Sequence, residues 1–186
     1  MSEQFWTIER VAGVCLIASN LATFPGLILF WKRAGHHGGT PPSRAYYVWE
    51  RGFIVAGIIF SALGFLVLQA SLQNTDGSIL GRIGALVFLF AGILGVVGES
   101  LHIKQDYAKS YPVIVIYVVL AFLAQAAIGG ALLQAAWVAG WLGGLTIVWN
   151  LGWLIVLPLL TPRDIYFPVL HYFLPLLIGI ALVWRA

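Results

Sequence analysis

Hydrophobic residues run almost without interruption along this chain, and charged residues stand in small groups between the runs. The longest run extends from Ser110 to Pro162 and contains no Asp, Glu, Lys, Arg or His. A helix crosses the hydrocarbon core of a bilayer with roughly 20 apolar residues. This run is therefore too long for one crossing and suits two crossings joined by a tight turn. The pattern predicts an integral membrane protein.

The same pattern, read along the whole chain, predicts an all-α, polytopic membrane protein with a bundle of six transmembrane helices. Groups of polar, Gly and Pro residues separate the apolar runs and are typical of turns. The predicted spans are about 11–31, 52–72, 80–103, 112–134, 138–160 and 165–184. The loops between them are too short for a separate domain. Residues 1–186 are therefore predicted to form a single transmembrane helical domain.

The composition agrees with this assignment and excludes several other classes. Hydrophobic residues make up 61% of the 186 residues and charged residues only 9%, whereas soluble domains carry roughly 25% charged residues. The net charge of +3 is too small and too dispersed for a nucleic-acid surface. Cys15 is the only cysteine, which excludes an internal disulfide and a CxxC redox pair.

Lysine and arginine residues are unevenly divided between the two predicted faces of the membrane. One face would carry Lys32, Arg33, Arg44, Arg51, Lys104, Lys109 and Arg163, and the other only Arg10, Arg82 and Arg185. Cytoplasmic loops of membrane proteins carry an excess of Lys and Arg. The count therefore predicts that the first face is cytoplasmic and that both termini lie outside. The short loops are typical of small bacterial multi-pass proteins, so a bacterial inner membrane is the expected location.

Small residues recur at helical spacing in three predicted spans, and each stripe includes ionisable residues. The second span contributes Glu50 and the sixth contributes His171. In the third span the stripe consists of Gly92, Gly95, Glu99 and His102. Helices in lipid pack through small residues, so we expect the ionisable side chains to point into the bundle. The direction of the spans puts them at similar depth, just inside the cytoplasmic face.

These ionisable residues have two interpretations, because such residues inside spans are costly and are usually paired or functional. In the structural interpretation, Glu99 pairs with Arg51 or with a protonated His171. In the functional one, Glu99, His102 and His171 bind a cofactor or transfer protons, and Glu50 and Arg51 orient them. Carboxylate and imidazole groups suit a single metal ion, and histidines suit a haem or a pigment. No cofactor is the default expectation.

A second candidate site lies in the fifth predicted span. Trp149 and Trp153 are one helical turn apart, with Asn150 beside them. They are candidates for the wall of a pocket that binds a flat lipophilic molecule. Packing of the two indole rings against a neighbouring helix is the alternative.

No motif in the chain names a reaction: there is no GxSxG elbow, HExxH helix or Walker loop. We therefore keep two hypotheses. The favoured one is a non-enzymatic membrane protein, either an accessory subunit of a larger membrane complex or a binder of a lipophilic ligand. The alternative is a membrane enzyme or cofactor-binding protein that uses Glu99, His102 and His171. The expected partners are the lipid bilayer and either membrane proteins or a lipophilic small molecule, with no nucleic acid.

Overall fold

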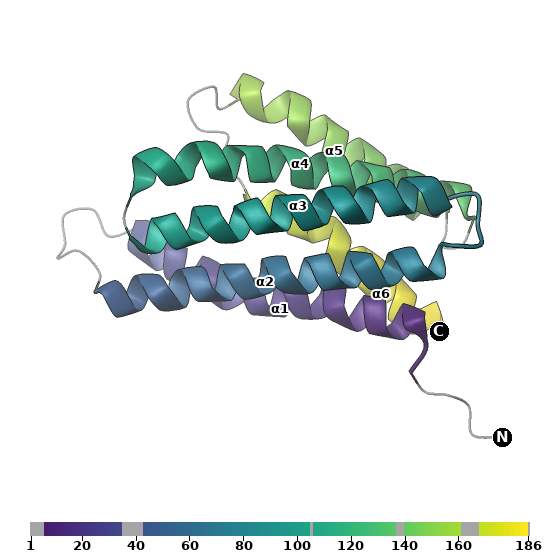
Figure 1. Cartoon of the computed structure of the whole chain (residues 1–186), viewed down its shortest axis with the longest axis horizontal. Coiled ribbons are helices and arrows are strands. Elements are labelled where there is room, and N and C mark those ends of the chain that lie inside the picture. Colours follow the sequence, from purple (N-terminus) through teal and green to yellow (C-terminus); the bar gives the residue numbers. More distant parts are fainter. Residues whose placement is uncertain (1–5, 35–42, 105, 137–139, 161–167, 186) are drawn as a thin grey trace.

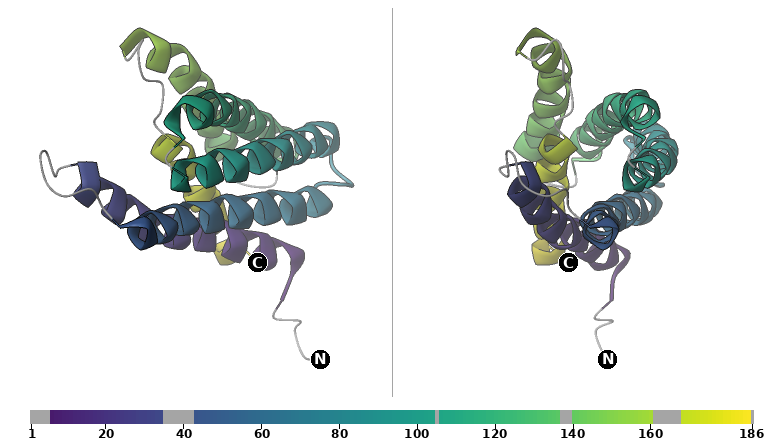
Figure 2. Two further views of the ribbon diagram at one scale, coloured as in Figure 1. Left: turned by 60° about the vertical axis from the view of Figure 1, so that its left-hand side comes forward. Right: turned by 90° about the vertical axis from the view of Figure 1, so that its left-hand side faces the viewer.

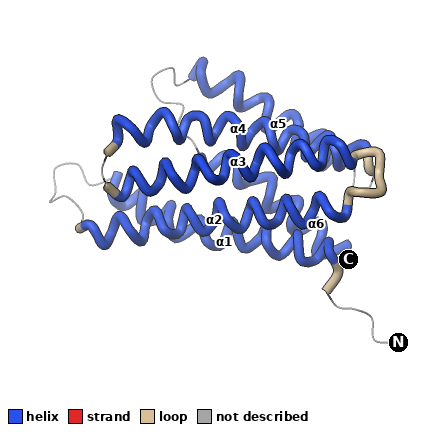
Figure 3. Tube along the Cα trace, viewed as in Figure 1, coloured by secondary structure: helices blue, strands red, loops and turns tan. Residues whose placement is uncertain are grey.

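The computed structural model of the chain describes residues 6–34, 43–104, 106–136, 140–160 and 168–185. Over these ranges the chain is helical and contains no strand (Figure 3). This confirms the all-α class. In chain order the elements are α1 (Ile8–Ala34), α2 (Arg44–Ser71), α3 (Ser78–Ile103), α4 (Tyr107–Gln134), α5 (Gly140–Leu160), the short 3₁₀ helix η1 (Pro168–Tyr172) and α6 (Phe173–Arg185).

The helices α1 to α5 are each long and apolar enough to cross a membrane. Their positions agree with the first five predicted spans to within a few residues at most ends, although α2 begins well before its predicted span. Lipid offers no hydrogen-bond partner to the backbone, so a spanning segment must satisfy its own peptide groups, as an α-helix does. The prediction of a multi-pass bundle of apolar helices is confirmed in this coarse form.

The sixth predicted span, 165–184, is not confirmed. Its first residues lie outside the described ranges, and the remainder divides into η1 and the 13-residue helix α6. An α-helix of that length extends about 20 Å, which is shorter than the roughly 30 Å hydrocarbon core. Pro175 gives a physical reason, because proline is tolerated in the first turn of an α-helix and disrupts its interior. The α-helix accordingly begins only at Phe173.

Each long helix packs against the next one along the chain, and α6 packs against α1. Viewed along the bundle, α6 lies between α1 and α5 (Figure 2), although α5 and α6 touch only slightly. The start of α1, the turn between α2 and α3, and the end of α6 share one end of the bundle (Figure 1). The ends of α1 and α3 and the starts of α2 and α4 share the other, which we call the basic end.

Glycines allow the closest approaches between helices. A Cβ atom added to Gly129 in α4 would lie 2.8 Å from the carbonyl oxygen of Gly143 in α5, and the reverse distance is also 2.8 Å. The crossing of α1 and α6 has the same reciprocal geometry at Gly13 and Gly179, with distances of 2.7 and 2.8 Å. Backbone meets backbone at both crossings, so a larger residue has no room. Close contact of this kind replaces the hydrophobic drive that lipid removes.

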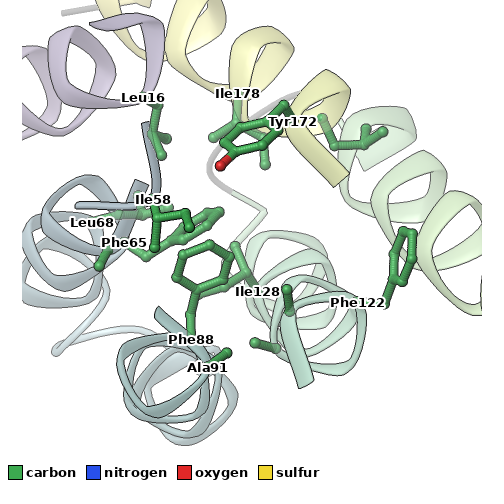
Figure 4. Packing of buried hydrophobic residues seen from close by; sticks show 14 of the residues in the cluster. Leu16, Ile58, Phe65, Leu68, Phe88, Ala91, Phe122, Ile128, Tyr172 and Ile178 are labelled. Atoms are coloured by element: carbon green, nitrogen blue, oxygen red, sulfur yellow. The ribbon is translucent and has the colours of Figure 1, made fainter. Parts of the chain in front are cut away.

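Aromatic and branched side chains fill the centre of the bundle (Figure 4). The rings of Phe65 in α2 and Phe88 in α3 meet edge to face, with centroids 4.8 Å apart. Leu16 from α1 and Ile178 from α6 are fully buried around them. The interior is therefore a packed core to which each of the six α-helices contributes side chains.

Adjacent glycines in α5 provide a matched test of this packing. We expect Gly143→Ala to lower the free energy of unfolding by about 1–3 kcal/mol, because overpacking forces neighbouring groups apart. Gly144→Ala should leave stability unchanged or raise it, since nothing lies within 4 Å of a Cβ added there and alanine favours helix. Thermal unfolding in a mild detergent measures both variants. Equal effects of the two substitutions would contradict the proposed α4–α5 contact.

Candidate functional site

The structure brings three of the predicted site residues together at the basic end of the bundle. Glu50 and Arg51 lie in the second turn of α2, and Glu99 lies in the last turns of α3. All three side chains are almost completely buried, with exposures of 1% or less. Arg33, from the end of α1, joins them from the edge of the cluster, with 18% of its side chain exposed.

These four side chains form a chain of ion pairs with alternating charge. The guanidinium group of Arg33 binds both carboxylate oxygens of Glu50, at 2.8 Å from Nε and 2.9 Å from Nη2. Arg51 donates from Nη2 to Glu50 Oε1 at 2.7 Å and from Nη1 to Glu99 Oε2 at 2.8 Å. The pairs connect α1 to α2 and α2 to α3. We call this set, Arg33, Glu50, Arg51 and Glu99, the ion-pair chain.

The ion-pair chain carries no net charge, because two arginines face two glutamates. Removing single ions from water is expensive, and burial is tolerated when each charge has a well-placed partner of opposite sign. Aromatic rings add to the compensation. The guanidinium carbons of Arg33 and Arg51 lie 5.1 and 5.7 Å from the ring centroid of Phe30, within the range of cation–π attraction.

Local geometry in α1 and α2 explains how the chain forms. Consecutive residues of an α-helix point about 100° apart, so Glu50 faces α1 while Arg51 reaches toward α3. Gly26 lets α1 approach α2 at this level, since a Cβ there would lie 2.8 Å from the carbonyl oxygen of Glu50. Arg33 lies two turns beyond Gly26 in α1 and pairs there with the Glu50 carboxylate.

The two histidines take different places. His102 is partly buried in the last turn of α3 and lies near the guanidinium groups of Arg51 and Arg33. His171 lies in η1 and is fully buried. Its Nε2 atom is 2.7 Å from the hydroxyl oxygen of Tyr117 in α4, while its Nδ1 atom has no hydrogen-bond partner.

Aromatic rings surround His171. Tyr117 meets the imidazole edge to face at 5.3 Å between centroids, and Phe122 does so at 6.3 Å. The ring of Tyr172 lies 4.1 Å away. The predicted cluster thus divides into the ion-pair chain and a separate imidazole–phenol pair. Over the described part of the chain, no three His, Cys, Asp or Glu side chains are placed to hold a metal ion.

The residues of the second predicted site, in α5, make packing contacts, and their role as a pocket wall stays a prediction. The indole nitrogen of Trp149 donates to the carbonyl oxygen of Leu170 at 2.9 Å, and its ring lies 5.0 Å from Phe173. Trp153 meets Trp149 edge to face at 5.7 Å. Asn150 is fully buried and donates to the carbonyl oxygen of Thr146 at 2.7 Å. These contacts agree with the alternative that the indole rings pack against a neighbouring helix.

The sequence did not reveal an apolar groove that lies between α2 and α3. It has a volume of about 310 Å³ and is lined by hydrophobic side chains, a size at the lower limit of ligand pockets, roughly 300–1,000 Å³. Ala62 and Gly92 lie in its floor. Its walls include Ile59, Leu63, Ile93 and Val97.

Sequence reasoning missed two participants in the buried polar contacts. Arg33 was counted only as a charge that flanks the first span. Its spacing of seven residues from Gly26, about two helical turns, could have shown that both face the same neighbouring helix. Tyr117 lies within the charge-free run, and nothing in the sequence distinguished it from the other aromatic residues of the apolar spans. Comparison of the chain with family models, with curated proteins and with solved structures found no match. Function must therefore be argued from the geometry.

Breaking the ion-pair chain should destabilise the bundle strongly. We expect Arg51→Leu to cost about 3–5 kcal/mol of unfolding free energy, because it leaves the buried Glu99 carboxylate without its counter-ion. Arg51→Leu combined with Glu99→Leu should recover most of that loss. The control is Lys109→Gln, which removes the exposed pair between Lys109 and Asp106 and should leave the melting temperature unchanged. A double variant as unstable as the single one would contradict the pairing.

The imidazole–phenol pair gives a second prediction. Tyr117→Phe removes the hydroxyl group and leaves His171 Nε2 buried without a partner, so we expect a loss of about 1–3 kcal/mol. Tyr111→Phe is the control, because Tyr111 is exposed at the start of the same helix. Thermal unfolding of both variants in the same detergent checks the prediction. An unaffected Tyr117→Phe protein would show that the contact contributes nothing to stability.

Proposed function

We propose that the chain is a non-enzymatic integral membrane protein that binds a lipophilic molecule at the groove between α2 and α3. The groove is the observation that carries this proposal. Its lining is almost wholly apolar, its volume is that of a small ligand pocket, and it lies between two helices long and apolar enough to cross a membrane. A molecule that reaches it arrives through the membrane, so the expected ligand is lipid-soluble.

The ion-pair chain supports a non-enzymatic role. A catalytic carboxylate must be able to touch a substrate or a reacting proton. Both oxygens of Glu50 already accept hydrogen bonds from Arg33 and Arg51, and the group is inaccessible to solvent. Recruiting it for chemistry would require breaking a buried ion pair. The chain is better explained as a clamp that holds α1, α2 and α3 together.

The accessory-subunit form of the hypothesis has less support. Transmembrane helices associate through small residues that permit close backbone approach. The walls of the groove are instead branched side chains, with Ile93 54% and Val97 47% exposed. Such walls hold a partner helix away from the groove floor while admitting a narrow, flexible chain.

The cofactor-binding alternative keeps one specific observation in its favour. His171 is buried with Nδ1 unpartnered, and a histidine ligand commonly has its other ring nitrogen hydrogen-bonded, as Nε2 is to Tyr117. A metal, haem or pigment on Nδ1 would need further ligands. The aromatic surroundings of His171 supply none that suits a metal ion on its own.

The finer topology belongs to the same proposal. We infer six crossings, with η1 and α6 in the last one. The basic end would face the cytoplasm of a bacterial inner membrane, and both termini would lie outside. The start of α1 and the end of α6 lie at the same end of the bundle, which supports an even number of crossings (Figure 1). Of the cationic residues in the prediction, Arg163 lies outside the described residues.

The test is an optical absorption spectrum, a metal analysis and an organic extraction of protein purified in mild detergent. We expect a colourless, metal-free protein that retains a lipophilic compound in stoichiometric amount. His102→Ala and His171→Ala should change thermal stability without changing the spectrum. A Soret or pigment band, or stoichiometric metal, that is lost in both variants would establish the cofactor-binding alternative. A protein that retains and binds no lipophilic compound would remove the proposal.

A further inference from the structure

The groove between α2 and α3 leads toward positions that suit a charged headgroup. We propose that its ligand is an anionic phospholipid, with one acyl chain in the groove and the phosphate group beside Lys104. This inference rests on the proposed lipophilic-ligand binding and names the class of ligand. It is carried by the register of the two helices and by the charge pattern at the basic end.

One face of α3 runs continuously from the groove to the basic end of the bundle. Ile93 and Val97 line the groove, and Ser100 and Lys104 follow them at intervals of three and four residues. Residues at such intervals lie on the same face of a helix. Ser100 and Lys104 are exposed, and α3 ends at the basic end of the bundle. A chain that lies in the groove therefore has a cation at the level where its headgroup would emerge.

The facing helix α2 continues in the same way. Leu63 and Ile59 line the groove, and Ala56, Gly52 and Trp49 follow at intervals of three and four residues toward the basic end. Among the residues that the structure describes, nothing would lie within 4 Å of a Cβ added to Gly52, so none of them fills the space beside this stretch. Trp49 is 66% exposed. Its indole ring suits the interfacial depth of a lipid ester and supplies an N–H donor.

The charge pattern favours an anionic headgroup over a zwitterionic one. Among the described residues at the basic end, the carboxylates of Glu50 and Glu99 are paired with arginine. Asp106 is paired with Lys109 at 2.9 Å, and a hydrogen bond from Lys109 lowers the pKa of Asp106. The phosphate of either lipid would meet Lys104, but the ammonium group of a zwitterionic headgroup would meet no uncompensated carboxylate among these residues.

The floor of the groove offers a position at which the site can be filled. Its floor is formed in part by Gly92, where an added Cβ would lie 3.4 Å from Ile58 and 3.9 Å from Ala62. These are ordinary contact distances, so a Cβ atom fits there among the residues that line the groove. Gly92 is therefore a better position for filling the site than the tightly packed Gly129 and Gly143.

The experiment is native mass spectrometry of delipidated full-length protein in mild detergent, titrated with phosphatidylglycerol or phosphatidylcholine of identical chains. We expect one tightly bound phosphatidylglycerol per chain and weaker binding of phosphatidylcholine. Gly92→Leu should weaken phosphatidylglycerol binding on the order of tenfold or more, because apolar contacts of the acyl chain are lost. Val97→Trp, which changes only an exposed wall residue, should act in the same direction if Gly92→Leu folds poorly.

Matched controls separate the site from general lipid binding. Gly152→Leu introduces the same side chain at an open position of α5 and should leave binding unchanged. Lys104→Gln should weaken binding of the anionic lipid about fivefold, the effect of one cation near a membrane surface. Arg82→Gln, which removes an exposed cation near the start of α3 at the opposite end of the bundle, should have no such effect.

The outcomes distinguish this inference from the proposed function. Lipid binding that neither Gly92→Leu nor Val97→Trp weakens would overturn the groove assignment while leaving lipophilic-ligand binding intact. Equal affinity for the two lipids, together with an unaffected Lys104→Gln, would overturn the headgroup assignment. A dimer that Gly92→Leu dissociates would assign the groove to a second copy of the chain. Absence of any retained or added lipophilic ligand would remove both proposals.

Discussion

A buried charge in a protein interior needs a partner of opposite sign, and this requirement organises one whole end of the bundle. Arg51 lies between Glu50 and Glu99, and Arg33 completes the set from α1. Water can reach little of these groups, so each ion depends on the others for compensation. The ends of three helices are thereby held in one relative rotation and register, because a shift of one residue would turn a charge away from its partner.

Over the described residues, the remainder of the bundle is held together by close contact between helices and not by ion pairs. Reciprocal glycine contacts set the crossings of α4 with α5 and of α1 with α6, and aromatic rings such as Phe65 and Phe88 fill the centre. Polar chemistry is consequently enclosed, whereas the surface offered to lipid is apolar. The groove between α2 and α3 is lined by hydrophobic residues and contains no ionisable group, which is why the proposed function is located there.

The sequence anticipated part of the buried polar site. Glu99 paired with Arg51 was one of the two interpretations, and the structure contains that pair. His171 was expected at the depth of Glu99, yet its hydrogen-bond partner is Tyr117. A tyrosine within a long apolar run carries no periodic signal of such a role. The metal, haem and pigment hypotheses stay predictions, and the structure adds only the unpartnered Nδ1 atom of His171 in their favour.

By itself, the sequence determined that long apolar runs become helices able to cross a membrane, since the backbone in lipid must satisfy its own hydrogen bonds. It also determined which end of the bundle is basic. Only the tertiary structure decided that Arg33 meets Glu50, that the described part of the last predicted span divides into η1 and α6, and that α2 and α3 leave a groove between them. Those features depend on the rotation of each helix about its axis and on the distance between helices. Neighbouring side chains point about 100° apart, so such contacts arise only when two packed helices are in place.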